Sequence, residues 1–154
     1  MFGTRAVVKS NEVDVSALEF QSRFQIEKPP FGYVRNPLHL LGSGFLLKYE
    51  DALKVAFGEY DKDVRCFPEV FPRFDHSPRS KGKELIYVND TPELFKKYLL
   101  KAFEMVKEKP KDRQIVFIRA WNEWGEGNYL EPDLDSGLGY LEAVRDSKNE
   151  SDKH

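Results

Sequence analysis

Two glutamates, Glu123 and Glu126, stand three positions apart in the stretch 120–133, which reads AWNEWGEGNYLEPD. Two carboxylates at short range can divide into one protonated and one ionised group, which supplies a general acid and a general base. Trp121 and Trp124 flank the pair, and flat indole faces suit the C–H faces of a sugar ring. Because glycosidic chemistry commonly uses a carboxylate pair, the stretch predicts a site that acts on a glycan.

A second polar cluster, Asp75, His76 and Arg79, follows two prolines in the run FPRFDHSPR at 71–79. These side chains are suited to hydrogen bonds with a polyhydroxy ligand or a phosphate. The alternative interpretation is an exposed turn with an aspartate-based cap. We expect no metal and no cofactor, because no second histidine at ligand spacing accompanies His76 and no nucleotide-phosphate motif occurs.

Three repeats of strand, loop and helix are expected to position these clusters. The predicted strands are 13–20, 64–70 and 115–120, and the predicted helices are 49–58, a helix capped by Thr91 that ends near Lys107, and 138–144. The apolar run at 115–118 is typical of a fully buried strand. Alternating strands and helices predict an α/β fold with parallel βα units, and polar loops at the carboxyl ends of parallel strands are where such folds keep their sites.

Composition excludes several classes of protein. Basic and acidic residues number 24 and 26, a net charge of −2, which leaves no electrostatic footprint for nucleic acid or an anionic membrane. A single cysteine, Cys66, excludes an internal disulfide. With neither a signal-like start nor a run of transmembrane length, we expect no transmembrane segment and a cytoplasmic location.

The sequence resembles the WbsX glycosyltransferase family, bacterial proteins of surface-polysaccharide and O-antigen gene clusters. The resemblance is carried by AWNEWGEG at 120–127, YLEPD at 129–133 and GYLEA at 139–143. The run at 71–79 looks like a second block of the family, and LEFQ at 18–21 looks like a third. The family's domain is similar to the endo-α-mannosidases of glycoside hydrolase family 99.

This resemblance implies a (β/α)8 TIM barrel with the acidic loop at the carboxyl end of a late strand. It implies that Glu123 is the base that deprotonates the sugar 2-hydroxyl, giving an anhydro-sugar intermediate. Glu126 would then be the acid and base at the glycosidic oxygen. Asn122 and the two tryptophans would position the sugar ring, and Asp75 and Arg79 would line the neighbouring wall.

A complete barrel takes about 200 residues or more, whereas this chain has 154. We therefore expect residues 13–145 to form a partial TIM barrel, its carboxyl-terminal part. Residues 1–12 are expected to be a frayed segment and 146–154 a disordered tail. Open edges of an incomplete sheet favour association, so a missing amino-terminal barrel half or self-association is the expected protein partner.

Two classes of function remain open at this point. One is a glycan-processing enzyme, either a WbsX-like glycosyltransferase of O-antigen or surface-polysaccharide biosynthesis or an endo-acting glycoside hydrolase. Transfer and hydrolysis need the same acid/base pair, so the residues do not separate them. The other is a non-catalytic carbohydrate-binding fragment that grips a glycan through Trp121, Trp124, Tyr129 and Tyr140.

A third interpretation gives the glutamates no chemistry. In it, Glu123 and Glu126 only cap the next helix and pair with Arg119, the cation nearest to them in sequence.

Overall fold

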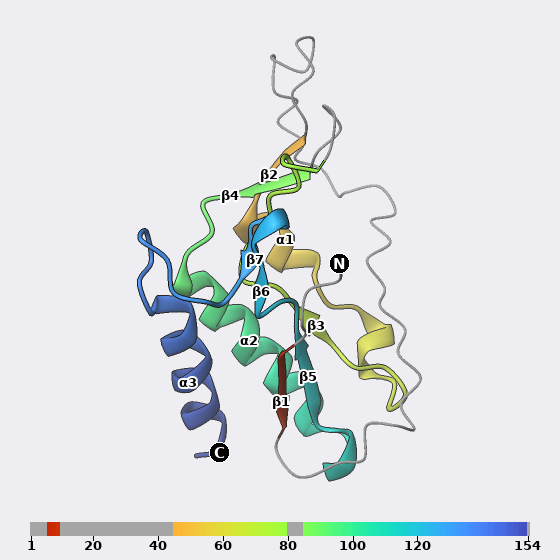
Figure 1. The fold of residues 1–154 in the computed structure, drawn as a ribbon. Helices are drawn as coiled ribbons and strands as arrows, with labels where there is room; N and C mark the ends of the chain where they lie inside the picture. The colour runs from red at the N-terminus through yellow and green to blue at the C-terminus, as the bar shows by residue number, and fades with distance from the viewer. Residues whose placement is uncertain (1–5, 10–44, 80–84, 154) are drawn as a thin grey trace.

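The computed structural model describes residues 6–9, 45–79 and 85–153, coloured in Figure 1. The strand predicted at 13–20 and the block at 18–21 lie outside these described residues. The strands are β1 (Ala6–Lys9), β2 (Phe45–Lys48), β3 (Glu69–Val70), β4 (Leu85–Val88), β5 (Ile115–Ile118), β6 (Asn122–Glu123) and β7 (Asn128–Tyr129). The helices are α1 (Tyr49–Val55), α2 (Pro92–Lys107) and α3 (Gly139–Ser151).

Strand β5 is the middle strand of a three-stranded sheet with the order β1-β5-β3. It runs parallel to β3, with Val70 opposite Ile118, and antiparallel to β1. Strands β2 and β4 form a separate parallel pair. The described strands therefore give a mixed α/β fold with short parallel pairs and no closed barrel. The predicted parallel pairing is present in these two pairs, whereas β1 adds an antiparallel strand to the sheet.

Helix α2 confirms the strongest local prediction. The Thr91 hydroxyl accepts a hydrogen bond from the backbone N–H of Leu94 at 3.2 Å, and Pro92 occupies the first turn, where the missing N–H costs nothing. The predicted apolar stripe is buried, and it packs on β3, β5 and α3. In Figure 1, α2 and α3 lie side by side. This layer of helices backs the strands that carry the polar loops.

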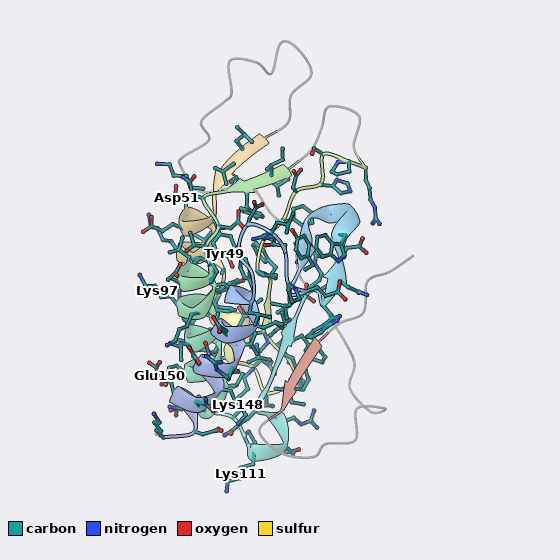
Figure 2. All side chains as sticks on the ribbon, turned by 60° about the vertical axis from the view of Figure 1, so that its left-hand side comes forward. Tyr49, Asp51, Lys97, Lys111, Lys148 and Glu150 are labelled. Carbon is teal, nitrogen blue, oxygen red and sulfur yellow. The ribbon has the colours of Figure 1, made fainter. Side chains whose placement is uncertain are left out.

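The core is rich in aromatic rings. Tyr49, at the start of α1, is fully buried and makes edge-to-face contacts with Phe71, Tyr87 and Tyr98, and its hydroxyl donates to the backbone oxygen of Phe71. Figure 2 shows Tyr49 inside the molecule and Lys97 on the outer side of α2. Because Phe71 follows β3 directly, this cluster anchors the start of the 71–79 loop.

Two predicted elements differ in length from those observed. Only Glu69–Val70 of the predicted strand 64–70 is a strand, because the Asp63 carboxylate accepts a hydrogen bond from the backbone N–H of Arg65 at 2.9 Å and fixes a turn there. Helix α1 ends at Val55 rather than near residue 58.

Helix α3 extends beyond its predicted end at residue 144, to Ser151, so the expectation of a disordered tail from residue 146 is wrong up to this point. Ser147 is fully buried, and Lys96 of α2 lies 2.9 Å from Glu150. Contacts with α2 therefore order the last turns of a segment whose own residues carry no apolar stripe.

Candidate functional site

The acidic loop folds into a small hairpin just past β5. Strands β6 and β7 pair antiparallel, with Asn122 opposite Tyr129, and a single 3-10 turn at Trp124–Glu126 joins them. Figure 1 shows both strands beyond the carboxyl end of β5. Gly127 closes the turn at a φ of 55°, and a Cβ there would lie 3.1 Å from the Asp75 Cβ. Only glycine combines this backbone conformation with so close an approach.

The 71–79 loop lies against this hairpin and holds both candidate glutamates. Arg79 Nη2 donates to Glu123 Oε1 at 2.8 Å, and Arg79 Nη1 donates to Glu126 Oε1 at 3.1 Å. The backbone N–H of Asp75 donates to the backbone oxygen of Glu126 at 2.8 Å. The side chains of Glu123 and Glu126 are 13% and 23% exposed. One guanidinium therefore gathers two partly accessible carboxylates at one place.

Arg79 holds each carboxylate through its Oε1 atom. The Oε2 atoms of Glu123 and Glu126 accept no hydrogen bond from the part of the chain that the structure describes. The hydrogen bonds of Arg79 therefore position each carboxylate through one of its two oxygens.

Among the described residues, the structure shows neither the Arg119 pairing nor the helix cap that the third interpretation gave to Glu123 and Glu126. Arg119 lies 3.7 Å from Glu69 and over the ring of Phe74, whereas Arg79 contacts the two glutamates. Helix α3 begins after Leu138 with no side-chain cap. Arg79 thus has the place beside the glutamates that this interpretation gave to Arg119.

His76 and Asp75 reach the site in different ways. His76 Nε2 lies 3.8 Å from Glu126 Oε1, and its ring stacks on Phe74 with 5.9 Å between centroids. Asp75 Oδ1 accepts the backbone N–H of Ser77 at 2.8 Å, so the aspartate-based turn is present as well. The Asp75 side chain shapes the loop, and its backbone holds Glu126.

The two tryptophans present exposed indoles beside the glutamates. Trp121 is 40% exposed and Trp124 is 49% exposed, and Asn122 is exposed between them. Trp124 stacks on Tyr129, with centroids 3.7 Å apart and planes 14° apart. Tyr129 itself is buried. The tryptophans and Asn122 therefore reach solvent, whereas Tyr129 supports the ring of Trp124 from behind.

A partly buried arginine, Arg73, organises the back of the site, and it was not among the predicted site residues. Its Nη1 donates to Asp133 Oδ2 at 2.7 Å and to the Tyr129 hydroxyl at 2.9 Å. Its Nε lies 3.2 Å from Asp90, and its guanidinium lies 4.5 Å from the centroid of the Tyr140 ring. The available signal was its position three residues after β3, within the block at 71–79.

Asp133 is the carboxylate most tightly held in this network, and its pKa is lowered. Burial by itself raises the pKa of Asp133, but hydrogen bonds from the Ser136 N–H and the Tyr129 hydroxyl, with the charge of Arg73, lower it overall. Its side chain is 8% exposed. The folded protein therefore holds Asp133 as an anion at a lower pH than the unfolded chain does.

This shift predicts an acid sensitivity. A depressed folded pKa contributes stability above the unfolded pKa, about 4, that is lost as the pH falls through the folded value. Replacing Asp133 with Asn should make the free energy of unfolding depend less steeply on pH as the pH falls below the unfolded pKa of about 4. Urea titrations at several pH values measure the slope. Parallel curves for parent and variant would contradict the assignment.

The chain also contains two Asp-x-Asp strings, at 61–63 and 133–135. In the second, the Asp133 side chain is engaged with Arg73 and with its own turn, and Asp135 is exposed. Within residues 6–9, 45–79 and 85–153, no group of three or more His, Cys, Asp or Glu side chains is placed to hold a metal ion. No helix in the same ranges is both long enough and apolar enough to cross a membrane.

Paired glutamates beside exposed indoles, placed after a central strand of an α/β chain, are side chains that carbohydrate-active sites commonly use. Residues 3–144 match the family model described as glycosyltransferase WbsX. The chain belongs to this family of glycan-related enzymes, and the resemblance carried by its motifs is confirmed.

Two curated relatives are each described as "Uncharacterized protein WxcX", from two strains of Xanthomonas campestris pv. campestris. Each is 38% identical over 85 residues, which covers 54% of this chain and 12% of the relative. The chain thus aligns with only a small part of these longer proteins. No solved structure matches.

Proposed function

We propose that this chain carries the acid/base centre of a glycan-processing enzyme, a glycosyltransferase of the WbsX type acting in bacterial surface-polysaccharide or O-antigen assembly. The observation that carries the proposal is the bridge that Arg79 makes to both Glu123 and Glu126. It gathers two carboxylates where Trp121 and Trp124 are exposed, which is the composition that sugar chemistry requires.

In the proposed reaction, Glu123 takes the proton of the sugar 2-hydroxyl while O2 attacks the anomeric carbon. Glu126 gives its proton to the leaving glycosidic oxygen, so the bond breaks as the anhydro ring forms. An acceptor hydroxyl then loses its proton to Glu126 and attacks the anomeric carbon, and Glu123 returns the proton to O2. Both glutamates end as they began.

The acceptor decides between transfer and hydrolysis. A glycan hydroxyl as acceptor gives transfer, and water gives the reaction of an endo-acting hydrolase, the second candidate. The resemblance to the endo-α-mannosidases favours this second candidate, because hydrolysis needs only the same two carboxylates. We further propose that residues 13–145 form the carboxyl-terminal part of a TIM barrel that a longer protein or a second chain completes.

The test is product analysis with the full chain. Manno-oligosaccharides are incubated with the protein, with and without an added glycan acceptor, and the products are identified by mass spectrometry. Elongated products support transfer, and shortened products alone support hydrolysis. Unchanged oligosaccharides together with a raised melting temperature would favour the non-catalytic carbohydrate-binding fragment. If the incubation gives no products and the melting temperature does not change, the proposal is contradicted.

A further inference from the structure

Trp124 is held on one face and at one edge. One face stacks on Tyr129 at 3.7 Å between centroids, and the indole Nε1 donates to Glu131 Oε2 at 2.6 Å. About half of the side chain nevertheless remains exposed. An aromatic side chain with one covered face, a fixed edge and an exposed remainder has the form of a stacking platform.

Tyr129, the support of this platform, is itself fixed. Arg73 Nη1 donates to its hydroxyl at 2.9 Å, and the hydroxyl donates to Asp133 Oδ2 at 3.1 Å. The guanidinium of Arg73 also lies 5.0 Å from the centroid of the Tyr129 ring. The position of the Trp124 ring therefore depends on two paths, a direct one from Glu131 and an indirect one from Arg73 through Tyr129.

We propose that Glu131 and Arg73 are positioning residues that hold Trp124 as a stacking platform, whose uncovered face takes the C–H face of a pyranose ring in the sugar chain. This inference rests on the proposed function for its ligand. The benefit is preorganisation, since an indole that is already immobilised loses little further freedom when a sugar binds. The platform also commits one aromatic ring, Tyr129, to support rather than to ligand contact.

The first arm of the test needs no ligand. With Trp121 replaced by Phe, Trp124 is the only tryptophan of the chain, and its fluorescence anisotropy decay reports the motion of the indole alone. Glu131→Ala should at least double the amplitude of sub-nanosecond depolarisation. Glu131→Gln keeps an acceptor for the indole N–H and should restore the parent decay. Tyr129→Phe, which removes the hydroxyl that Arg73 binds, should give an intermediate increase.

The matched control is Glu142→Ala, an exposed glutamate on α3, which should leave the decay unchanged. An unchanged decay in Glu131→Ala would overturn the positioning role. Melting temperatures show whether each variant is folded. If Glu131→Ala does not fold, the decay of Tyr129→Phe still tests whether the supports of Trp124 restrict its motion.

The second arm measures the affinity for manno-oligosaccharides by calorimetry. Glu131→Ala should weaken binding about three- to tenfold, the loss expected from one side chain that must be ordered on binding. In a Trp124→Phe background, which lacks the indole N–H, the same change should have no further effect. Independent, multiplying effects would overturn the claim that Glu131 acts through Trp124. If neither the parent protein nor any variant binds the manno-oligosaccharides, the glycan is not the ligand and the proposed function is contradicted. The anisotropy measurement still decides whether Glu131 positions Trp124.

Discussion

Replacing Glu126 with Gln is expected to lower the turnover of a glycan substrate about a thousandfold while the affinity for that glycan changes by less than about threefold. A positioned acid or base contributes roughly 10²–10⁴ in rate, and Gln has the size of Glu but exchanges no proton. The loop should keep its place, because the backbone oxygen of Glu126 accepts from Asp75 whichever side chain stands there. Rates of product formation and calorimetric affinities measure the two effects.

Two comparisons make this result specific. Glu104→Gln changes an exposed glutamate of α2 and should leave turnover unchanged. A substrate that lacks the 2-hydroxyl should not be turned over by the parent protein, because Glu123 would have no proton to take. Parent-level turnover by Glu126→Gln would remove Glu126 from the acid/base role.

The helices that could be predicted from sequence are those whose signals are local. Thr91, Pro92 and the apolar stripe that follows all lie within one helix and its cap, and they predicted α2 correctly. The end of α3 could not be predicted in this way, since Lys96, which lies 2.9 Å from Glu150, belongs to another helix. The strand expected at 64–70 was too long because the side-chain turn at Asp63 outweighs the β propensity of the β-branched residues in that segment.

In the candidate site, too, the features that could be predicted are those with local signals. Each polar block could be read from its own residues, and the parallel pairing of β3 with β5 was expected to bring their loops together. Which cation meets the glutamates could not be predicted. Arg119 is nearer in sequence, but Arg79 approaches because Gly125 has no side chain, and a Cβ there would lie 2.7 Å from Arg79 Nη2.

The network of Arg73 was missed for a related reason. Its partners Asp90 and Asp133 follow β4 and β7, and no local pattern joins them to a residue that follows β3. Only the packing of three loops at one end of the strands produces the cluster.

Among the single substitutions considered, we expect the largest loss of stability from replacing Arg73 in this cluster. Arg73→Leu should lower the free energy of unfolding by about 3 kcal/mol, the low end of the range for breaking a buried ion pair by removing one partner. The side chains of Asp133 and Asp90 are 8% and 21% exposed, so both would remain largely buried without their cation. Urea unfolding at pH 7 measures the change, read at an unchanged m value.

Arg65→Leu is the matched control, since Arg65 pairs with Asp63 through a side chain that is 84% exposed. Exposed ion pairs contribute little to stability, and this variant should unfold close to the parent. Equal losses in the two variants would mean that the burial of Arg73 does not matter.

A second substitution separates charge from packing. If the loss in Arg73→Leu comes from a stranded carboxylate, replacing Asp133 with Asn in the same chain removes that charge and should recover part of the stability. The double variant would then be more stable than the sum of the two single losses predicts. Additive losses would place the effect in the packing of Arg73 on Tyr140 and Tyr129 instead. The distinction bears on the site, because the hydroxyl that Arg73 and Asp133 share belongs to the ring that supports Trp124.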